Sequence, residues 1–316
     1  MISQSNLDML DAIAAMMEEN CPVSADLIRR LVAEVQQGGP LARMLSRHPD
    51  VNDPLFGTRA LAGVRRLMLA GRAPALDAHL AGFLARGREP GYPERTWELV
   101  RAAALENPEP IAEALSRPVQ QHTPSRAAML VRGLGMVAAP EVRLLELGAC
   151  AGLNLIPDKY RWIGRDWQWG DAGSAVSMMA AGPFPGRIEI VDRAGCDIHP
   201  LDVHDDADIL TLQSFIPLEM EIAAMELADA IGVAAACDFT IDEAPAAEWL
   251  SDKLAYGDRN CHTVVWHSLF WDYLPPAEQD AVEEILASAA RRMPLATVCF
   301  EPVHLGAPPR LQVRLY

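Results

Sequence analysis

The chain has 316 residues, of which 50% are hydrophobic and 22% are charged, so it is long enough for one large domain or two ordinary ones. Its formal net charge is −16, from 43 acidic and 27 basic residues. Nonspecific binding to nucleic acids or anionic membranes relies on Lys and Arg, so this charge argues against both. The sequence shows neither a signal peptide nor the roughly 20 apolar residues that span a bilayer. We therefore expect a cytoplasmic protein that binds neither nucleic acid nor membrane.

The six cysteines are scattered through the chain and form no Cys-x-x-Cys pair. Five of them lie in or beside predicted strands or turns of the second half, where a buried reduced thiol is more common than a disulfide. The six are Cys21, Cys150, Cys196, Cys237, Cys261 and Cys299. We therefore expect free thiols, which agrees with a cytoplasmic location.

The first part of the chain has apolar residues at helical spacing and no strand-like alternation. A first helix is predicted between Leu7 and Met17, and Asn20-Cys21-Pro22 ends it. A second helix is expected from Ser24, a possible N-cap, to Val35. Further helices between Pro and Gly residues are predicted at 41–45, 61–68, 76–84, 97–105 and 111–115. Residues 1–125 are therefore predicted to form an all-helical N-terminal domain or cap.

A polar segment from Arg117 to Arg126 joins this part to the second half, and a helix over residues 127–137 follows it. A polar loop at a domain junction is a common place for a ligand pocket. A simple linker accounts for the same composition, and we favour that interpretation slightly.

The stretch from Val142 to Asn154 predicts a strand followed by a glycine turn. An apolar run ends at Glu146, and Gly148 and Gly152 come after it. Glycines let the backbone turn tightly and approach a ligand without a Cβ. The apolar spacing over residues 153–163 favours a helix, whose N-terminus would offer N–H groups at the same place. This order is typical of an α/β sheet that binds a ligand at its carboxyl edge.

The Glu-x-Gly-x-x-x-Gly pattern departs from the dinucleotide fingerprint Gly-x-Gly-x-x-Gly and lacks the Lys-Ser/Thr of a phosphate loop. It resembles the first motif of class I S-adenosylmethionine-dependent methyltransferases, in which an acidic residue precedes the glycine turn that ends the first strand. Two alternatives stay open: a strand–helix turn that binds no cofactor, and a turn that binds another kind of nucleotide.

The segment from Tyr160 to Asp171 holds three of the seven tryptophans. Such a cluster can form a wall around an aromatic substrate or around the cationic sulfonium of a cofactor. More often it is an insertion that packs its own small core, and we favour that interpretation. Residues 174–180, which follow, fit either a strand or a short helix.

Two strand-like segments, at residues 188–191 and 195–198, follow the aromatic segment, and the second contains Asp197. In nucleotide-binding Rossmann-like folds, an acid at the end of the second strand accepts hydrogen bonds from ribose hydroxyls. Asp197 is therefore the candidate for that contact. It lies much further from Gly148 than the usual distance of about 20 residues, and the aromatic insertion would account for the excess.

The histidines and carboxylates between His199 and Asp206 could in principle ligate a metal. The carboxylates over 205–208 also suit the beginning of a helix at residues 209–215, because they complement its dipole. We favour the helix and expect no metal site.

A long helix is predicted over residues 218–231, followed by a strand over 237–242 that ends in acids. Asp242 and Glu243 could accept a hydrogen bond from the exocyclic amine of an adenine. They could equally begin the helix predicted over 246–254. Both interpretations stay open.

The fourth predicted strand begins at His262 and ends at His267 and Ser268. Because carboxyl ends of parallel strands meet at one edge, His267 is expected to face the same crevice as Gly148. Helix 277–293, strand 295–300 and a sixth strand over 311–316 complete the pattern. We therefore predict an α/β fold with a Rossmann-like, class I methyltransferase-like doubly wound sheet over residues 126–316, preceded by the all-helical domain.

Several segments together resemble a bacterial family known as domain of unknown function 2332. They are Arg117–Arg126, Leu144–Asn154 with Asp158 and Tyr160, Asp197–Asp202, and Val264–Ser268 with Tyr273-Leu274. The resemblance spans most of the chain and implies a Rossmann-like relative of methyltransferases. The chain departs from the family pattern at His122-Thr123, where an Asn-Glu pair is usual, and at Cys150, where Ser is usual.

The leading functional hypothesis is an S-adenosylmethionine-dependent methyltransferase that acts on a small molecule. The methionine end of the donor would be held by Glu146, Gly148, Ala149, Gly152 and Asn154. Asp197 would hold the ribose, and Asp242 or Glu243 the adenine. His267 is the candidate general base because its ordinary pKa lies near neutrality, although a packed histidine at a strand end is the interpretation we favour.

The alternative is a binding protein that keeps the fold and a ligand pocket but performs no chemistry. A hydrolase ranks last, because Ser268 and His267 are neighbours on a strand and point to opposite faces, and the sequence has no Gly-x-Ser-x-Gly elbow. The sequence indicates neither the methyl acceptor nor the oligomeric state.

Overall fold

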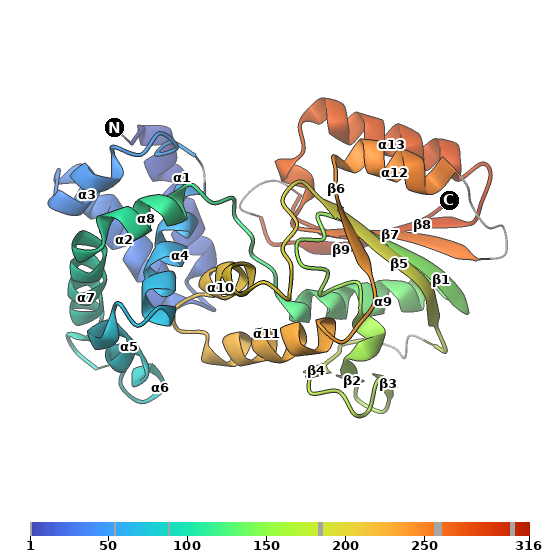
Figure 1. Ribbon diagram of the computed structural model, residues 1–316, viewed down its shortest axis with the longest axis horizontal. Coiled ribbons are helices and arrows are strands. Elements are labelled where there is room, and N and C mark those ends of the chain that lie inside the picture. The colour runs from blue at the N-terminus through green and yellow to red at the C-terminus, as the bar shows by residue number, and fades with distance from the viewer. Residues whose placement is uncertain (1, 54, 88, 183–185, 256–260, 304–306) are drawn as a thin grey trace. The chain divides into compact units, whose positions relative to one another are not determined.

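The computed structural model describes residues 2–53, 55–87, 89–182, 186–255, 261–303 and 307–316 (Figure 1). The chain forms two compact units. The first contains Met1–Gln121 and Asp206–Met225, and the second contains His122–Asp205 and Glu226–Tyr316. The boundary expected at residue 125 thus falls at Gln121, and residues 206–225, which we had placed in the second domain, belong to the first unit.

The first unit is helical in its described residues, as the sequence predicts. Its helices are α1 (Gln4–Met17), α2 (Pro22–Gln36), α3 (Pro40–Leu45), α4 (Phe56–Leu69), α5 (Pro74–Leu80), α6 (Phe83–Arg86), α7 (Tyr92–Glu106), α8 (Pro108–Leu115), α10 (Asp206–Ser214) and the start of α11 (Glu221–Ala234). Prolines begin several of them, because the first helical position needs no N–H. Ser24 is not the N-cap of α2: the cap is Cys21, and the Ser24 hydroxyl donates to Glu219 at 2.6 Å.

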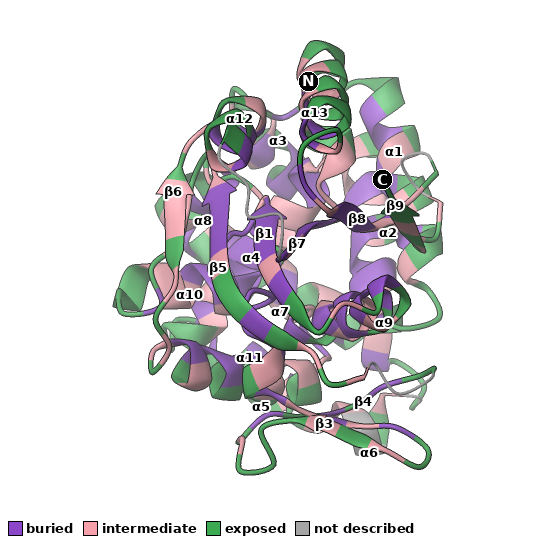
Figure 2. Cartoon of the chain, turned by 90° about the vertical axis from the view of Figure 1, so that its right-hand side faces the viewer, coloured by how far each residue is buried: buried purple, intermediate pink, exposed green. Residues whose placement is uncertain are grey.

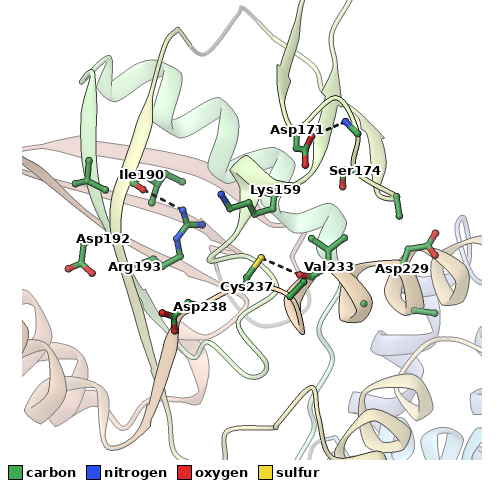
Figure 3. Close-up of a pocket in the computed structure, with 16 residues that line it drawn as sticks. Lys159, Asp171, Ser174, Ile190, Asp192, Arg193, Asp229, Val233, Cys237 and Asp238 are labelled. Atoms are coloured by element: carbon green, nitrogen blue, oxygen red, sulfur yellow. Dashed lines mark hydrogen bonds between the residues drawn. The ribbon is translucent and has the colours of Figure 1, made fainter.

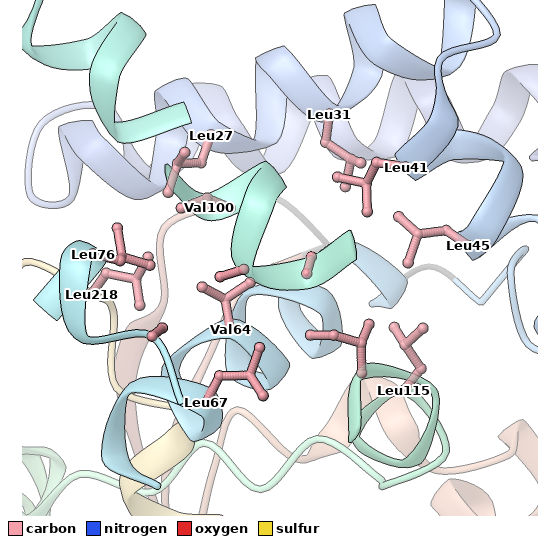
Figure 4. Packing of buried hydrophobic residues seen from close by; sticks show 14 of the residues in the cluster. Leu27, Leu31, Leu41, Leu45, Val64, Leu67, Leu76, Val100, Leu115 and Leu218 are labelled. Carbon is pink, nitrogen blue, oxygen red and sulfur yellow. The ribbon is translucent and has the colours of Figure 1, made fainter. Parts of the chain in front are cut away.

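Leucine side chains from α2, α3, α4, α5 and α8 fill the centre of this unit (Figure 4). Leu218, from the segment between α10 and α11, packs into the same cluster. The buried Arg65 of α4 donates to the carbonyl oxygens of Gln213 and Leu218, at 3.1 and 3.3 Å. These contacts explain why residues 206–225 fold with the helical unit.

The second unit contains a six-stranded sheet in the order β6-β5-β1-β7-β8-β9. The strands are β1 (Glu141–Leu147), β5 (Glu189–Asp197), β6 (Thr240–Glu243), β7 (His262–Ser268), β8 (Leu295–Glu301) and β9 (Arg310–Leu315). The first five in the sheet are parallel and β9 is antiparallel, so the unit is α/β with a mostly parallel sheet. Most of β7 and β8 is buried, while β9 at the edge is largely exposed (Figure 2).

Helices cover both faces of this sheet. On one face α9 (Ala127–Val137) packs on β8 and β9. Gly133 permits this approach, because a Cβ there would lie 2.3 Å from Val298 Cγ1. On the other face lie α12 (Ala246–Ala255) and α13 (Pro276–Ala289). The strand order reverses between β1 and β7, and ligands of open α/β sheets bind at such a switch point.

The helix predicted after Gly152 is wrong. Residues 153–156 form a turn and a bend, the 3₁₀ turn η2 (Pro157–Lys159) follows, and the chain then forms short strands. Pro157 disfavours a helical conformation at the residue before it. Three of the apolar side chains that suggested one face of a helix, Leu153, Ile156 and Tyr160, are instead completely buried in the unit.

The aromatic segment forms a separate sheet in the order β3-β2-β4. Its strands are β2 (Arg161–Ile163), β3 (Gln168–Gly170) and β4 (Ser177–Met179), the last confirming the strand alternative for residues 174–180. Tyr160 and Trp162 are fully buried, and Trp162 Nε1 donates to Pro157 O at 2.7 Å. The segment therefore packs its own small core, as we favoured.

The remaining predicted elements agree in type with the structure. The two strand-like segments at 188–191 and 195–198 join into the single strand β5. The six cysteines are free thiols. Within the described residues, no helix is both long and apolar enough to cross a membrane.

Candidate functional site

Polar side chains gather at the carboxyl ends of β1, β7 and β8, on both faces of the sheet. Glu146 of β1 is in register with Trp266 of β7, and both point to the face covered by α9. His267 follows Trp266 and, because side chains alternate along a strand, points to the face of α12 and α13. The single crevice that we expected therefore has two parts, one around Glu146 and one around His267.

Glu146 lies at the centre of the first part and is only 2% exposed. Its Oε1 accepts hydrogen bonds from Trp266 Nε1 at 3.1 Å and from Asn154 Nδ2 at 3.4 Å. Its Oε2 has no partner among the described residues. Burial raises the pKa of this carboxyl group to about 8, although those two hydrogen bonds oppose the shift. Glu146 is therefore mainly protonated at pH 7.

Asn154 and His122 continue this group, which we call the Glu146 cluster (Glu146, Asn154 and His122). Asn154 Nδ2 lies 3.0 Å from His122 Nε2, and both side chains are buried. Burial lowers the pKa of His122 to about 3, so the ring is neutral. When Nε2 accepts the amide hydrogen, the ring proton is on Nδ1. Within the described residues, His122 Nδ1 and Asn154 Oδ1 have no partner, as for Glu146 Oε2.

The polar bridge contributes His122 and Arg126 to this site. Arg126 belongs to the 3₁₀ turn η1 (Pro124–Arg126), directly before α9. Burial lowers the pKa of its guanidinium, and the nearby Glu146 and Glu301 carboxyl groups oppose that shift. The bridge is therefore part of the site and not a simple linker. Its polar composition next to a predicted helix was the signal, but nothing in the sequence showed that it meets Glu146.

The glycine turn after β1 is tied to the end of β5. Gly148, Cys150 and Gly152 have positive φ angles of 69°, 51° and 71°. Cys150 N–H donates to Asp197 Oδ2 at 2.9 Å, and His199 N–H donates to the other oxygen of Asp197 at 2.9 Å. Asp197 thus lies beside the turn, as expected, and also holds its backbone in place.

Aromatic rings lie against both glycines of the turn. A Cβ on Gly148 would lie 2.2 Å from the ring of Phe270, and a Cβ on Gly152 would lie 2.3 Å from the ring of Phe239. The glycines do allow a close approach, but in this structure protein side chains occupy the space. Sequence reasoning overlooked both phenylalanines.

The structure distinguishes the two acids at the end of β6. Asp242 accepts from Trp249 Nε1 at 2.6 Å and forms an ion pair with Lys253 at 2.9 Å, and the bond to Lys253 is the main reason why its pKa is lowered. Glu243 is exposed and lies in register with Asp197. Ile198, directly after Asp197, is 62% exposed. Glu243, and not Asp242, is therefore the open acid next to Asp197.

His267 lies in the second part of the site. Its Nδ1 is 2.7 Å from Glu301 Oε1, and the Trp271 ring stacks on it with centroids 5.1 Å apart. Phe270 N–H donates to both Glu301 oxygens at 3.1 Å. Burial lowers the pKa of His267, but its hydrogen bonds with Cys299 and Glu301 outweigh this and raise the pKa to about 9. The imidazole is thus protonated at pH 7, which does not suit the general base that we expected.

No group of three or more His, Cys, Asp or Glu side chains among the described residues is arranged to hold a metal. The helix α10 begins at Asp206, with Asp206 and Asp208 in its first turn, as the favoured interpretation predicts.

An open pocket of about 970 Å³ lies elsewhere in the second unit (Figure 3). Residues 190–193 of β5, residues 171–175 and the end of α11 line it. Arg193 is one of the lining residues, and its guanidinium donates hydrogen bonds of 2.6 and 2.9 Å to the Asp158 carboxylate. The pocket lies along the first half of β5, away from the carboxyl ends that carry the Glu146 cluster.

A family model described as uncharacterized protein conserved in bacteria, DUF2332, matches residues 8–316. A search of curated proteins and a search of solved structures found no match. The segments that carried the family resemblance supply residues of the site: the bridge supplies His122 and Arg126, the glycine turn Glu146 and Asn154, and β7 supplies His267.

Proposed function

This chain belongs to the DUF2332 family of bacterial proteins, and we propose that its second unit binds S-adenosylmethionine and transfers the methyl group to a small molecule. One observation carries the proposal: the Glu146 cluster presents three buried polar atoms that have no partner in the described part of the chain, beside the glycine turn. Asn154 Oδ1 is an acceptor, His122 Nδ1 is a donor, and Glu146 Oε2 becomes an acceptor when a bound cation displaces the proton of the carboxyl group. Two acceptors and a donor match the ammonium and carboxylate of an amino acid, such as the methionine end of this cofactor.

Side chains at the carboxyl ends of the adjoining strands would contact the ribose and the adenine of the cofactor. Asp197 at the end of β5 would accept from the ribose hydroxyls, and Glu243 from the amine of the adenine. The exposed Ile198, directly after Asp197, offers an apolar surface for the base. Because the strand order places these groups in sequence from β1 outwards, one extended ligand could contact all of them.

S-adenosylmethionine supplies an activated methyl group, so the protein's task is to position donor and acceptor for in-line displacement. Glu146 and Asn154 would orient the donor, and the protonated His267 next to Glu301 would stabilise negative charge on an acceptor. Phe270 lies against Gly148, so its ring has to move for a ligand to contact that glycine.

Calorimetric titration with S-adenosylmethionine and S-adenosylhomocysteine tests this proposal. We expect micromolar affinity for the wild type and a loss of at least tenfold in Asp197→Ala, about 1.4 kcal/mol or more. Asp192→Ala is the matched control, because Asp192 lies on the same strand, is exposed and is distant from the carboxyl end. Absence of binding to the folded wild type, or equal losses in both variants, would contradict the assignment.

The second candidate is a binding protein that has kept this sheet but lost the chemistry. The phenylalanine rings over Gly148 and Gly152 favour it, because they fill the space next to the turn. Phe270→Ala tests whether the ring keeps the cofactor out. If only this variant binds the cofactor, the natural chain uses the fold for another ligand. If the wild type binds equally well, methyl transfer to an acceptor supports the methyltransferase proposal, and binding without turnover supports this second candidate.

A further inference from the structure

Cys299 lies next to a histidine–carboxylate pair at the carboxyl edge of the sheet. It is the in-register partner of His267 on the neighbouring parallel strand, so both side chains point to the same face. Glu301 follows two residues later on β8, and its Oε1 is 2.7 Å from His267 Nδ1. A thiol next to an imidazole that a carboxylate orients is the arrangement that activates nucleophilic cysteines.

The surroundings of Cys299 differ from those of the other cysteines. Cys21, Cys150, Cys196 and Cys261 are buried, whereas Cys299 and Cys237 are only partly buried. Burial raises the pKa of the Cys237 thiol, and its Sγ bonds to the Val233 carbonyl oxygen at 3.2 Å. Cys299, in contrast, lies beside the protonated His267. Its hydrogen bond with His267 helps to raise the pKa of the imidazole.

Charged groups around this site come from several elements. Glu301 on β8 interacts with His267 and with Arg126, which precedes α9. Arg310 of β9 is in register with Glu301, and the side chain of Arg314, further along β9, forms an ion pair with Glu283 of α13. Gln312, opposite Cys299, is uncharged, and its carbonyl oxygen accepts from Cys299 Sγ at 3.7 Å. His267 is thus the cation next to the thiol.

We infer that Cys299 is a reactive thiol that exchanges with low-molecular-weight disulfides, with the His267 imidazolium stabilising its thiolate and Glu301 as the positioning residue. Cys299 loses its proton to solvent, and the thiolate attacks one sulfur of the disulfide. A new S–S bond forms between Cys299 and that sulfur, the original S–S bond breaks, and the leaving thiolate takes a proton from solvent. The products are a protein mixed disulfide and one small thiol, so the step needs no further oxidant.

The test measures the rate of the exchange with oxidised glutathione between pH 5 and 9, and mass spectrometry locates the modified residue. We expect Cys299 to react first, and to react at pH 7 at least tenfold faster than Cys237. Cys299→Ser should abolish the fast reaction, whereas Cys237→Ser, the matched control, should leave it unchanged.

Glu301→Gln separates activation from simple exposure. Without the carboxylate, the imidazolium loses stabilisation, so the pH midpoint of the Cys299 reaction should shift and the rate at pH 7 should change by several-fold. A purely structural role of Glu301 would leave the pH profile of a folded variant in place. Modification of another cysteine first, or a Cys299 rate no greater than that of Cys237, would overturn the inference, and both results are readable on wild-type protein alone.

Discussion

At the scale of single residues, Glu146 shows how burial determines the chemistry of a side chain. The same carboxyl group on a protein surface would be ionised at pH 7. Here it has a pKa of about 8, because burial outweighs its two hydrogen bonds and the nearby Arg126. Glu146 and the neighbouring His122 are both neutral at pH 7. A cation that binds there is stabilised when the Glu146 carboxyl group loses its proton and becomes negatively charged. Ligand binding at Glu146 is therefore expected to release protons.

The pKa of Glu146 also predicts a dependence of stability on pH. The folded pKa is raised above its unfolded value of about 4.5, so the folded state binds more protons and the free energy of unfolding falls as pH rises from about 4.5 to 8. Gln resembles the protonated acid and does not titrate. Glu146→Gln should therefore raise the free energy of unfolding at pH 8 and have little effect near pH 4.

Chemical denaturation of the wild type and of Glu146→Gln at pH 4, 6 and 8 measures the difference in their free energies of unfolding. Glu243→Gln is the control, because Glu243 is exposed at the same edge of the sheet. A gain of the same size at all three pH values would show that folding does not raise the pKa of Glu146.

At the scale of elements, α9 depends on a glycine at its contact with the sheet. A Cβ on Gly133 would lie 2.3 Å from Val298 Cγ1 and 3.1 Å from Cγ2. The helix lies directly after Arg126 and the bridge, so a displaced α9 would also disturb the Glu146 cluster. Gly232 in α11 has no heavy atom within 4 Å of an added Cβ and offers a matched comparison.

Gly133→Ala is expected to lower the free energy of unfolding by about 1–3 kcal/mol, because overpacking outweighs the better helix propensity of alanine. Gly232→Ala should raise it by about 0.5–1 kcal/mol. Urea unfolding of the two variants gives both values. If the two substitutions act in the same direction, then α9 is not held against Val298 as the structure describes.

Element types were readable from the sequence wherever apolar spacing and proline or glycine positions agreed, as in α9 and β7. The helix expected after Gly152 is wrong because apolar residues at this spacing occur both on one face of a helix and in a non-helical segment that is buried. Periodicity alone does not distinguish the two. Leu153 and Ile156 are buried on all sides, and Pro157 prevents the helix that their spacing suggested.

At the scale of the whole molecule, the chain leaves the second unit after Asp205 and returns at Glu226. Leu218 in this excursion packs into the leucine core of the helical unit. Leu218→Ala should cost about 2–5 kcal/mol, as for other buried leucines. Ile222→Ala, four residues later and 70% exposed, should cost less than 0.5 kcal/mol.

Hydrogen exchange followed by mass spectrometry shows where the loss falls. Protection should decrease in α2 and α4, while β1 and β7 keep theirs, because Leu218 contributes to the core of the helical unit. An equal decrease in β1 and β7 would mean that the two units unfold together.

The sequence by itself determined the helical first part, the α/β second part and the acids at the strand ends, including Glu146, Asp197 and Glu243. These follow from local information: spacing of apolar residues, turn residues and the position of each acid after a strand. The sequence also indicated His267, but as a histidine with an ordinary pKa near neutrality.

Only the tertiary structure decided which of these groups meet. His122 and Asn154 are 32 positions apart and come together with Glu146, and hydrogen bonds with Cys299 and Glu301 raise the pKa of His267 and make it a cation at pH 7. The closed glycine turn, with Phe270 and Phe239 against it, likewise depends on chain segments distant in sequence. Contacts of this kind, and the burial that shifts a pKa, arise from packing across the sheet, which local sequence patterns do not encode.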